Sequence, residues 1–201
     1  MVLNLARPEV ADWLYGTLHD LLSKNAIDFL KWDMNRPFTE AGWPAASGDP
    51  DRLWIDHVRN LYAVIDRLRA DHPGLRIESC SSGGGLVDLG ILARTDQVWT
   101  SDNTDAADRV DIQHGFSQVY PARVMGAGAT VSPNPYTGRR LPLDFRFHAA
   151  MAGVLGVGDD LNRWDEGELA RAAEHVAAYK RVRQLVQRAN STGCGLSATA
   201  S

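Results

Sequence analysis

The sequence has little of what marks membrane, nucleic-acid-binding or disulfide-rich proteins. No apolar run in its 201 residues approaches the roughly 20 that a membrane helix needs, and the first residues lack the basic-then-apolar pattern of a signal peptide. The net charge is −4 with no block of basic residues, which argues against a nucleic-acid partner. The two cysteines, Cys80 and Cys194, stand in unlike contexts. We therefore expect reduced thiols and a cytoplasmic location.

Metal and cofactor patterns are missing as well. No paired histidine or cysteine spacing appears, and Asp159-Asp160 is interpreted as a solvated pair rather than as metal ligands. The glycine-rich segment Cys80–Gly85 lacks the Gly-Lys-Ser/Thr and G-x-G-x-x-G orders, so it is a weak signal for a phosphate loop. The alternative interpretations of this segment are close backbone approach to a small polar ligand, a simple turn, and a catalytic thiol at Cys80. We predict no metal and no cofactor.

The composition, 44% hydrophobic and 23% charged, is typical of a soluble globular protein. Short apolar runs alternate along the chain with amphipathic segments. This pattern predicts strands at 1–5, 27–32, 75–80, 97–101 and 124–132. Helices are predicted at 7–24, 52–70, 87–93, 106–119 and 166–188, and a helix, or a helix followed by a strand, at 145–157. We expect a loop at 38–50 and a disordered tail at 190–201, which leaves 1–189 as the folded part.

Repeated strand-then-helix units with buried strands predict a parallel α/β sheet. Two architectures fit: an open doubly wound sheet, and a (β/α)₈ barrel. A closed barrel typically needs about 250 residues, and this chain has 201. The sequence pattern therefore leaves an open sheet, or a barrel without its first units.

Two of the apolar runs stop at an acidic residue. Asp33 follows the run that begins at Ile27, and Asp102 follows Trp99-Thr100-Ser101. The carboxyl ends of parallel strands are where active sites are built, and two carboxylates can act as nucleophile and general acid on one glycosidic bond.

Each of these acids also has a structural interpretation. Asp33 could cap the following helix, although the cations of Lys31 and Arg36 nearby would keep it ionised, as a nucleophile requires. Asp102 could be an N-cap, whereas clustering with Asp105 would raise a carboxyl pKa, as a general acid requires.

Three motifs together resemble the α-galactosidases of glycoside hydrolase family 36. They are Lys31–Arg36, Glu78–Gly85 and Trp99–Asp105, in the family's order and at fitting spacing. The resemblance runs from about residue 2 to about residue 188. It implies an incomplete (β/α)₈ TIM barrel, covering about strands 3 to 8 with their helices, in which residues 1–189 are part of the catalytic domain.

The family implies retaining hydrolysis of terminal α-galactosides such as melibiose and raffinose, without a cofactor. By motif position, Asp33 resembles the nucleophile and Asp102 the acid/base, with Asp105 as the fallback if the alignment slips. Lys31, Trp32 and Asn35 resemble substrate-binding residues beside the nucleophile, and Cys80 and Gly83 resemble the loop that lines the galactose pocket. Retention requires carboxyl groups about 5–5.5 Å apart.

The resemblance also implies that the chain is a fragment. Residues 2–5 resemble the third barrel strand, so the first two strands and the family's flanking β-domains are expected to be absent. We therefore expect poor activity from this chain alone, and a homo-oligomer for the full-length protein. The alternatives are a non-catalytic or degenerate sugar-binding fragment, a transglycosylase similar to raffinose synthases, and a doubly wound nucleotide-binding protein.

Overall fold

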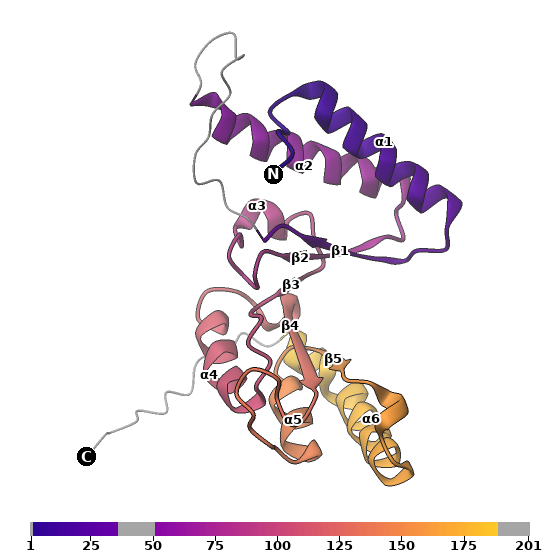
Figure 1. Ribbon diagram of the computed structural model, residues 1–201, viewed down its shortest axis with the longest axis vertical. Helices are drawn as coiled ribbons and strands as arrows, with labels where there is room; N and C mark the ends of the chain where they lie inside the picture. Colours follow the sequence, from indigo (N-terminus) through magenta and orange to yellow (C-terminus); the bar gives the residue numbers. More distant parts are fainter. Residues whose placement is uncertain (1, 36–50, 189–201) are drawn as a thin grey trace, which may run out of the picture. The chain divides into compact units, whose positions relative to one another are not determined.

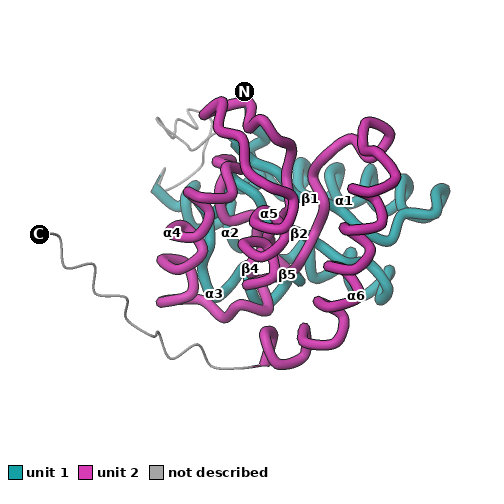
Figure 2. Tube along the Cα trace, turned by 90° about the horizontal axis from the view of Figure 1, so that it is seen from below, with its two compact units in different colours: residues 1–96 teal, residues 97–201 magenta. Residues whose placement is uncertain are grey.

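The computed structural model describes residues 2–35 and 51–188. The chain divides into two compact units, residues 1–96 and 97–201, which are coloured separately in Figure 2. Strands and helices alternate along both units, as Figure 1 shows, and each unit is described by itself.

The described residues of the first unit form two parallel strands and three helices. Its elements in order are α1 (Pro8–Lys24), β1 (Phe29–Asp33), α2 (Arg52–Asp71), β2 (Arg76–Cys80) and α3 (Leu89–Leu92). Proline at the start of α1 suits a position whose amide has no helical partner. The long helices α1 and α2 pack on each other, and the fully buried Val64, Ile65 and Leu68 of α2 pack with Ile77 of β2. Burial of this apolar face holds the unit together.

Strand β1 presents different side chains on its two sides. Leu30 and Trp32 pack against the apolar core beside the helices, whereas Lys31 and Asp33 are exposed. A strand has a period of two, so Lys31 and Asp33 share the opposite side from Trp32. This alternation decides which motif residues can act together.

The second unit contains three parallel strands. Its elements in order are β3 (Gln97–Trp99), α4 (Ala106–Ser117), β4 (Met125–Thr130), α5 (Leu143–Ala150), β5 (Val154–Gly158) and α6 (Glu166–Arg188). Strand β4 pairs with both β3 and β5. Gly153, just before β5, lies close to the start of β4: a Cβ there would lie 2.3 Å from the Met125 carbonyl oxygen. Phe147 fills the core between β4 and α6.

Most predicted elements are confirmed, and the segment at 145–157 is a helix followed by a strand. The predicted strand at 1–5 is wrong over the described residues 2–5, because Leu5 lies in a turn. The Asn4 side chain accepts the Ala6 amide at 3.1 Å, and Asn60 of α2 donates to the Leu5 carbonyl at 2.6 Å. These bonds satisfy the backbone without a strand partner. The predicted loop at 38–50 and tail at 190–201 lie outside the described residues.

Across the described ranges, no helix combines the length and the hydropathy needed to cross a bilayer.

Candidate functional site

Four polar side chains gather on one side of the β1–β2 pair in the first unit. The register places Lys31 opposite Glu78 and Asp33 opposite Cys80. The Lys31 ammonium lies 3.2 Å from a Glu78 carboxylate oxygen, and Glu78 is 6% exposed. Asp33 ends β1 and is exposed. The structure thus brings the predicted residues Lys31, Asp33 and Cys80 together and adds Glu78, which the sequence analysis did not select.

The charges of this group follow from its burial and its contacts. Burial opposes the charge on Lys31, but the hydrogen bond and the charge of Glu78 outweigh burial, and Cys80 and Asp33 add to this effect. The pKa of Lys31 is therefore raised. Burial also raises the pKa of the Cys80 thiol; a backbone contact with Gly83 opposes the shift, and a hydrogen bond with Asp33 adds to it. A thiol held neutral does not suit a nucleophile, so Cys80 is better placed as a hydrogen-bonding neighbour of Asp33.

The glycine-rich loop after β2 is held by β1. Ser81 Oγ donates to the Met34 carbonyl at 2.6 Å, and the Ser82 amide donates to Asn35 Oδ1 at 2.7 Å. Ser82 and Gly83 have φ angles of 48° and 88°, a region that glycine adopts without strain. Asn35 and Gly83, two predicted substrate residues, are therefore both part of this turn.

The same loop does not form a phosphate cradle. The Ser81 amide donates to the Gly83 carbonyl, the Ser82 amide to Asn35, and the Gly85 amide to the Ser81 carbonyl. These amides are already used within the protein and do not converge on an anion. The alternative of a nucleotide-binding protein therefore has no phosphate-binding site in this loop.

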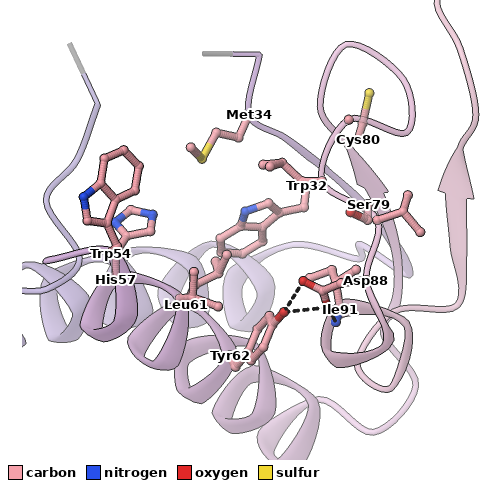
Figure 3. A pocket seen from close by; sticks show the side chains of 14 residues that line it. Trp32, Met34, Trp54, His57, Leu61, Tyr62, Ser79, Cys80, Asp88 and Ile91 are labelled. Carbon is pink, nitrogen blue, oxygen red and sulfur yellow. Dashed lines mark hydrogen bonds between the residues drawn. The ribbon is translucent and has the colours of Figure 1, made fainter. Parts of the chain in front are cut away.

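Trp32 faces the opposite side of β1 from Lys31 and Asp33, although Cys80 also lines the pocket beside it. Its ring faces a pocket of about 430 Å³, beside Leu61 and Tyr62 of α2, whereas the Cys80 sulfur points away from it (Figure 3). The Tyr62 hydroxyl contacts both Asp88 carboxylate oxygens at 2.8 and 2.9 Å. Burial, together with this acceptor, raises the pKa of Tyr62 to about 12. The substrate contact of Trp32 stays a prediction, and its position indicates a packing role.

Asp102 follows β3 in the second unit and is exposed. The indole Nε1–H of Trp99 donates to Asp102 Oδ1 at 3.1 Å. The buried Arg109 fixes the backbone beneath it by donating to the carbonyls of Ser101 at 3.1 Å and Gly126 at 2.6 Å. The Asp102 side chain is therefore exposed on a backbone that hydrogen bonds hold in place.

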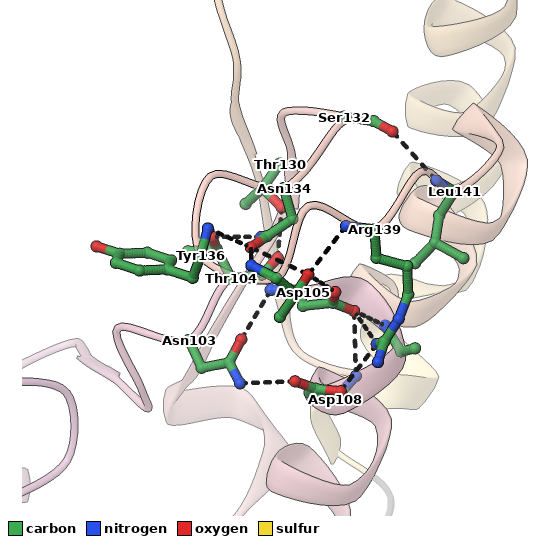
Figure 4. Close-up of polar contacts among 12 residues, drawn as sticks. Asn103, Thr104, Asp105, Asp108, Thr130, Ser132, Asn134, Tyr136, Arg139 and Leu141 are labelled. Atoms are coloured by element: carbon green, nitrogen blue, oxygen red, sulfur yellow. Dashed lines mark hydrogen bonds and ion pairs between the residues drawn. The ribbon is translucent and has the colours of Figure 1, made fainter.

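Asp105 has a structural role instead. It is 1% exposed and caps α4, accepting the amides of Ala107 and Asp108. Thr137 donates to it, and the Arg139 guanidinium lies 2.6 Å away (Figure 4). Burial opposes the charge of Asp105, but these hydrogen bonds outweigh burial and hold its pKa below the usual range. The fallback assignment of Asp105 as acid/base therefore does not fit.

Other features escaped the sequence analysis. Asp159 was expected to be solvated, and this is wrong: its side chain is 9% exposed and pairs with buried Arg146 at 3.2 Å. The partners are 13 residues apart, a separation that no local motif signals. Within residues 2–35 and 51–188, no group of three or more His, Cys, Asp or Glu is placed to hold a metal ion.

Comparisons with known proteins identify the family of this chain. The Melibiase family model matches residues 1–189. The α-galactosidase AgaA of Geobacillus stearothermophilus is 41% identical over 188 residues, which are 93% of this chain and 26% of AgaA. α-Galactosidase C of Emericella nidulans is 46% identical over 153 residues, which are 76% of this chain and 20% of that protein. The chain thus spans about a quarter or less of the length of these curated relatives.

Solved structures give the same result. The crystal structure of AgaA, described as a GH36 α-galactosidase, matches with a TM-score of 0.89 at 41% identity, covering 94% of this chain and 26% of AgaA. An α-galactosidase of Lactobacillus brevis matches with a TM-score of 0.88 at 38% identity, with the same coverage. Variants of AgaA have been crystallised with raffinose and with stachyose. The chain therefore belongs to the Melibiase family and has the parallel α/β fold of GH36 α-galactosidases.

Proposed function

We propose that this chain supplies the catalytic residues of a retaining α-galactosidase that hydrolyses terminal α-galactosides of the raffinose type. The observation that carries the proposal is the exposed Asp33 at the end of β1, beside the Lys31 ammonium and the Cys80 thiol. The raffinose and stachyose complexes of AgaA support this class of substrate.

Asp33 is proposed as the nucleophile and Asp102 as the acid/base. Both are exposed: Asp33 ends β1 and Asp102 lies three residues after the end of β3, and parallel α/β proteins place their catalytic groups at such strand ends. The AgaA variants crystallised with raffinose and stachyose each replace an aspartate. Those two aspartates are separated along AgaA by nearly the same number of residues as Asp33 and Asp102 are here.

The proposed reaction is a double displacement. Asp33 attacks the anomeric carbon while Asp102 gives its proton to the leaving oxygen, which forms a covalent galactosyl-Asp33 ester. Asp102, now a carboxylate, then removes a proton from water, and the water displaces Asp33 to release galactose. The Lys31 ammonium, whose pKa is raised chiefly by Glu78 against the effect of burial, supplies positive charge on the same side of β1 as Asp33.

The repeated strand–helix units also support the proposal that the chain is part of a (β/α)₈ barrel. Within each unit the paired strands are parallel, and each strand is followed by a helix. Such units are the building blocks of the barrel, whose catalytic residues lie at the carboxyl ends of the strands.

A graft into AgaA tests these roles, because the relative supplies the rest of an active enzyme. Residues 2–188 of this chain replace the matching segment of AgaA, and hydrolysis of nitrophenyl α-galactoside is measured. We expect an active graft, from which Asp33→Ala removes activity by about 10³-fold or more, with partial rescue by azide as a replacement nucleophile. Asp28→Ala, which changes another exposed acid of the same unit, is the matched control and should keep activity.

Two results would contradict the proposal. Turnover of the Asp33→Ala graft at the level of the Asp28→Ala control would remove Asp33 from its role. An inverted galactose product, read by NMR in the first minutes of reaction, would exclude the double displacement.

A further inference from the structure

Glu78 is a buried acid that has no part in the proposed mechanism. It lies in the middle of β2 and is 6% exposed. A buried carboxylate is costly unless it is paired and hydrogen-bonded, so a strand of this kind would ordinarily carry an apolar residue there. Its neighbours Ile77 and Ser79 are buried on the other side of the strand, so the Glu78 side chain does not pack into the apolar core beside the helices.

The register of the strands explains what Glu78 contacts. Lys31 is its direct partner in the parallel pair, and the ammonium lies 3.2 Å from Glu78 Oε1. The Lys31 side chain is 42% exposed, so its charged end reaches solvent while one side of it is held by the buried acid. Asp33 and Cys80 form the next pair on the same side. Glu78 therefore holds the lysine next to the end of the strand where Asp33 stands.

We propose that Glu78 is a positioning residue that fixes the Lys31 ammonium beside Asp33 on the substrate-facing side of the β1–β2 pair. This inference rests on the proposed function for the identity of that side. Glu78 keeps Lys31 extended along the strand pair, so that the ammonium stays available to a sugar hydroxyl beside Asp33. A buried anion can hold a lysine in this way better than an exposed one, because water screens it less.

Removing the charge of Glu78 should act through Lys31. In Glu78→Gln the amide keeps the shape but loses the negative charge. The pKa of Lys31 then falls, because the hydrogen bond and the charge of Glu78 are lost while burial remains. The charged groups that share this side are Asp33 of β1 and Arg76 of β2, and the Cys80 thiol completes the group. Without the charge of Glu78, the Lys31 ammonium is no longer held in its place on the side of Asp33.

The direct test is an NMR titration of Lys31 in the 201-residue chain. The chemical shift of Lys31 ¹³Cε, assigned by comparison with Lys31→Met, is followed against pH in the wild type and in Glu78→Gln. We expect a lower pKa in Glu78→Gln. Glu78→Asp keeps the charge with a shorter reach and should give an intermediate value. Asp20→Asn removes the acid of the exposed Lys24 pair and should leave Lys31 unchanged. An unchanged Lys31 pKa in both folded Glu78 variants would overturn the inference, and Glu78→Asp supplies the result if Glu78→Gln does not fold.

A double-mutant cycle in the AgaA graft separates positioning from simple support of the fold. If Glu78 acts through Lys31, the loss of kcat/KM from Glu78→Gln, about tenfold or more, largely disappears when Lys31 is already Met. Losses that multiply would overturn the inference, because a purely structural role gives independent effects. Failure of the proposed function has a different signature: Asp33→Ala would stay active, while the NMR result for Lys31 could stand.

Discussion

Asp105 provides the most quantitative prediction, because its surroundings distinguish an acid that holds the fold from an acid that reacts. Its carboxylate is buried at the start of α4, where it accepts the amides of Ala107 and Asp108. It also accepts hydrogen bonds from Thr137 and Arg139, which tie the later loop to the helix. Asp105→Ala removes all of these contacts at once.

The expected loss of stability is about 3 kcal/mol. Loss of an N-cap costs about 1 kcal/mol, and loss of the charge-assisted bonds from Thr137 and Arg139 adds about 2 kcal/mol. Asp105→Asn keeps a good capping acceptor but loses the charge, so it should lose roughly half as much. With a urea m-value of about 2 kcal/mol per molar, the Ala variant should unfold at a urea concentration about 1.5 M lower. The matched control is Asp111→Ala, which changes an exposed acid of the same helix.

The pH dependence has a defined sign. Hydrogen bonds hold the pKa of Asp105 below its usual range in the folded protein. A carboxyl with a depressed folded pKa stabilises the fold above its unfolded pKa, about 3.9, and this stability is lost as pH falls through the folded value. The difference between wild type and Asp105→Ala should therefore be constant from pH 5 to 8 and shrink below about pH 4. Urea unfolding followed by circular dichroism measures it; a difference within about 0.5 kcal/mol at pH 7 would refute the reasoning.

Further predictions concern a close contact and the proposed acid/base. A Cβ at Gly90 would lie 2.6 Å from the Tyr62 ring, so Gly90→Ala should lower the free energy of unfolding by about 1–3 kcal/mol. The control Gly16→Ala lies in a helix with open space around it and should raise the free energy of unfolding slightly. Equal effects of the two substitutions in urea unfolding would contradict the close packing at Gly90. Trp99→Phe removes the hydrogen bond that the indole donates to the Asp102 carboxylate, so in the AgaA graft kcat/KM should fall because the carboxylate loses an orienting contact. A kcat/KM equal to that of the parent graft would show that this bond does not position Asp102.

Much of the fold could be predicted from the sequence. Long segments with a helical period, such as 52–70 and 166–188, correspond to α2 (Arg52–Asp71) and α6 (Glu166–Arg188). The stop of an apolar run at an acidic residue correctly indicated where β1 ends. Even the separation of Trp32 from Lys31 and Asp33 was available in principle, because a strand has a period of two. We placed all three residues in one site because they are adjacent in one motif, and so overlooked this separation.

The remaining errors come from contacts between distant residues. The apolar pattern at 1–5 resembles a strand, but Asn60 of α2 takes the Leu5 carbonyl and leaves a turn. Asp159 is polar in sequence and buried in the structure because Arg146 pairs with it. Glu78 is one residue of a recognised motif, yet its pairing with Lys31 depends on the register of two strands 47 residues apart. Local propensity carries none of this information.

The central claim is that Asp33 forms a covalent bond to galactose, and mass spectrometry tests it most directly. The AgaA graft is incubated with a fluorinated α-galactosyl substrate that slows the second displacement, and its peptides are then mapped. We predict a galactosyl adduct on Asp33, in the peptide that contains Trp32 and Met34. An active graft whose adduct lies on another residue would contradict this account.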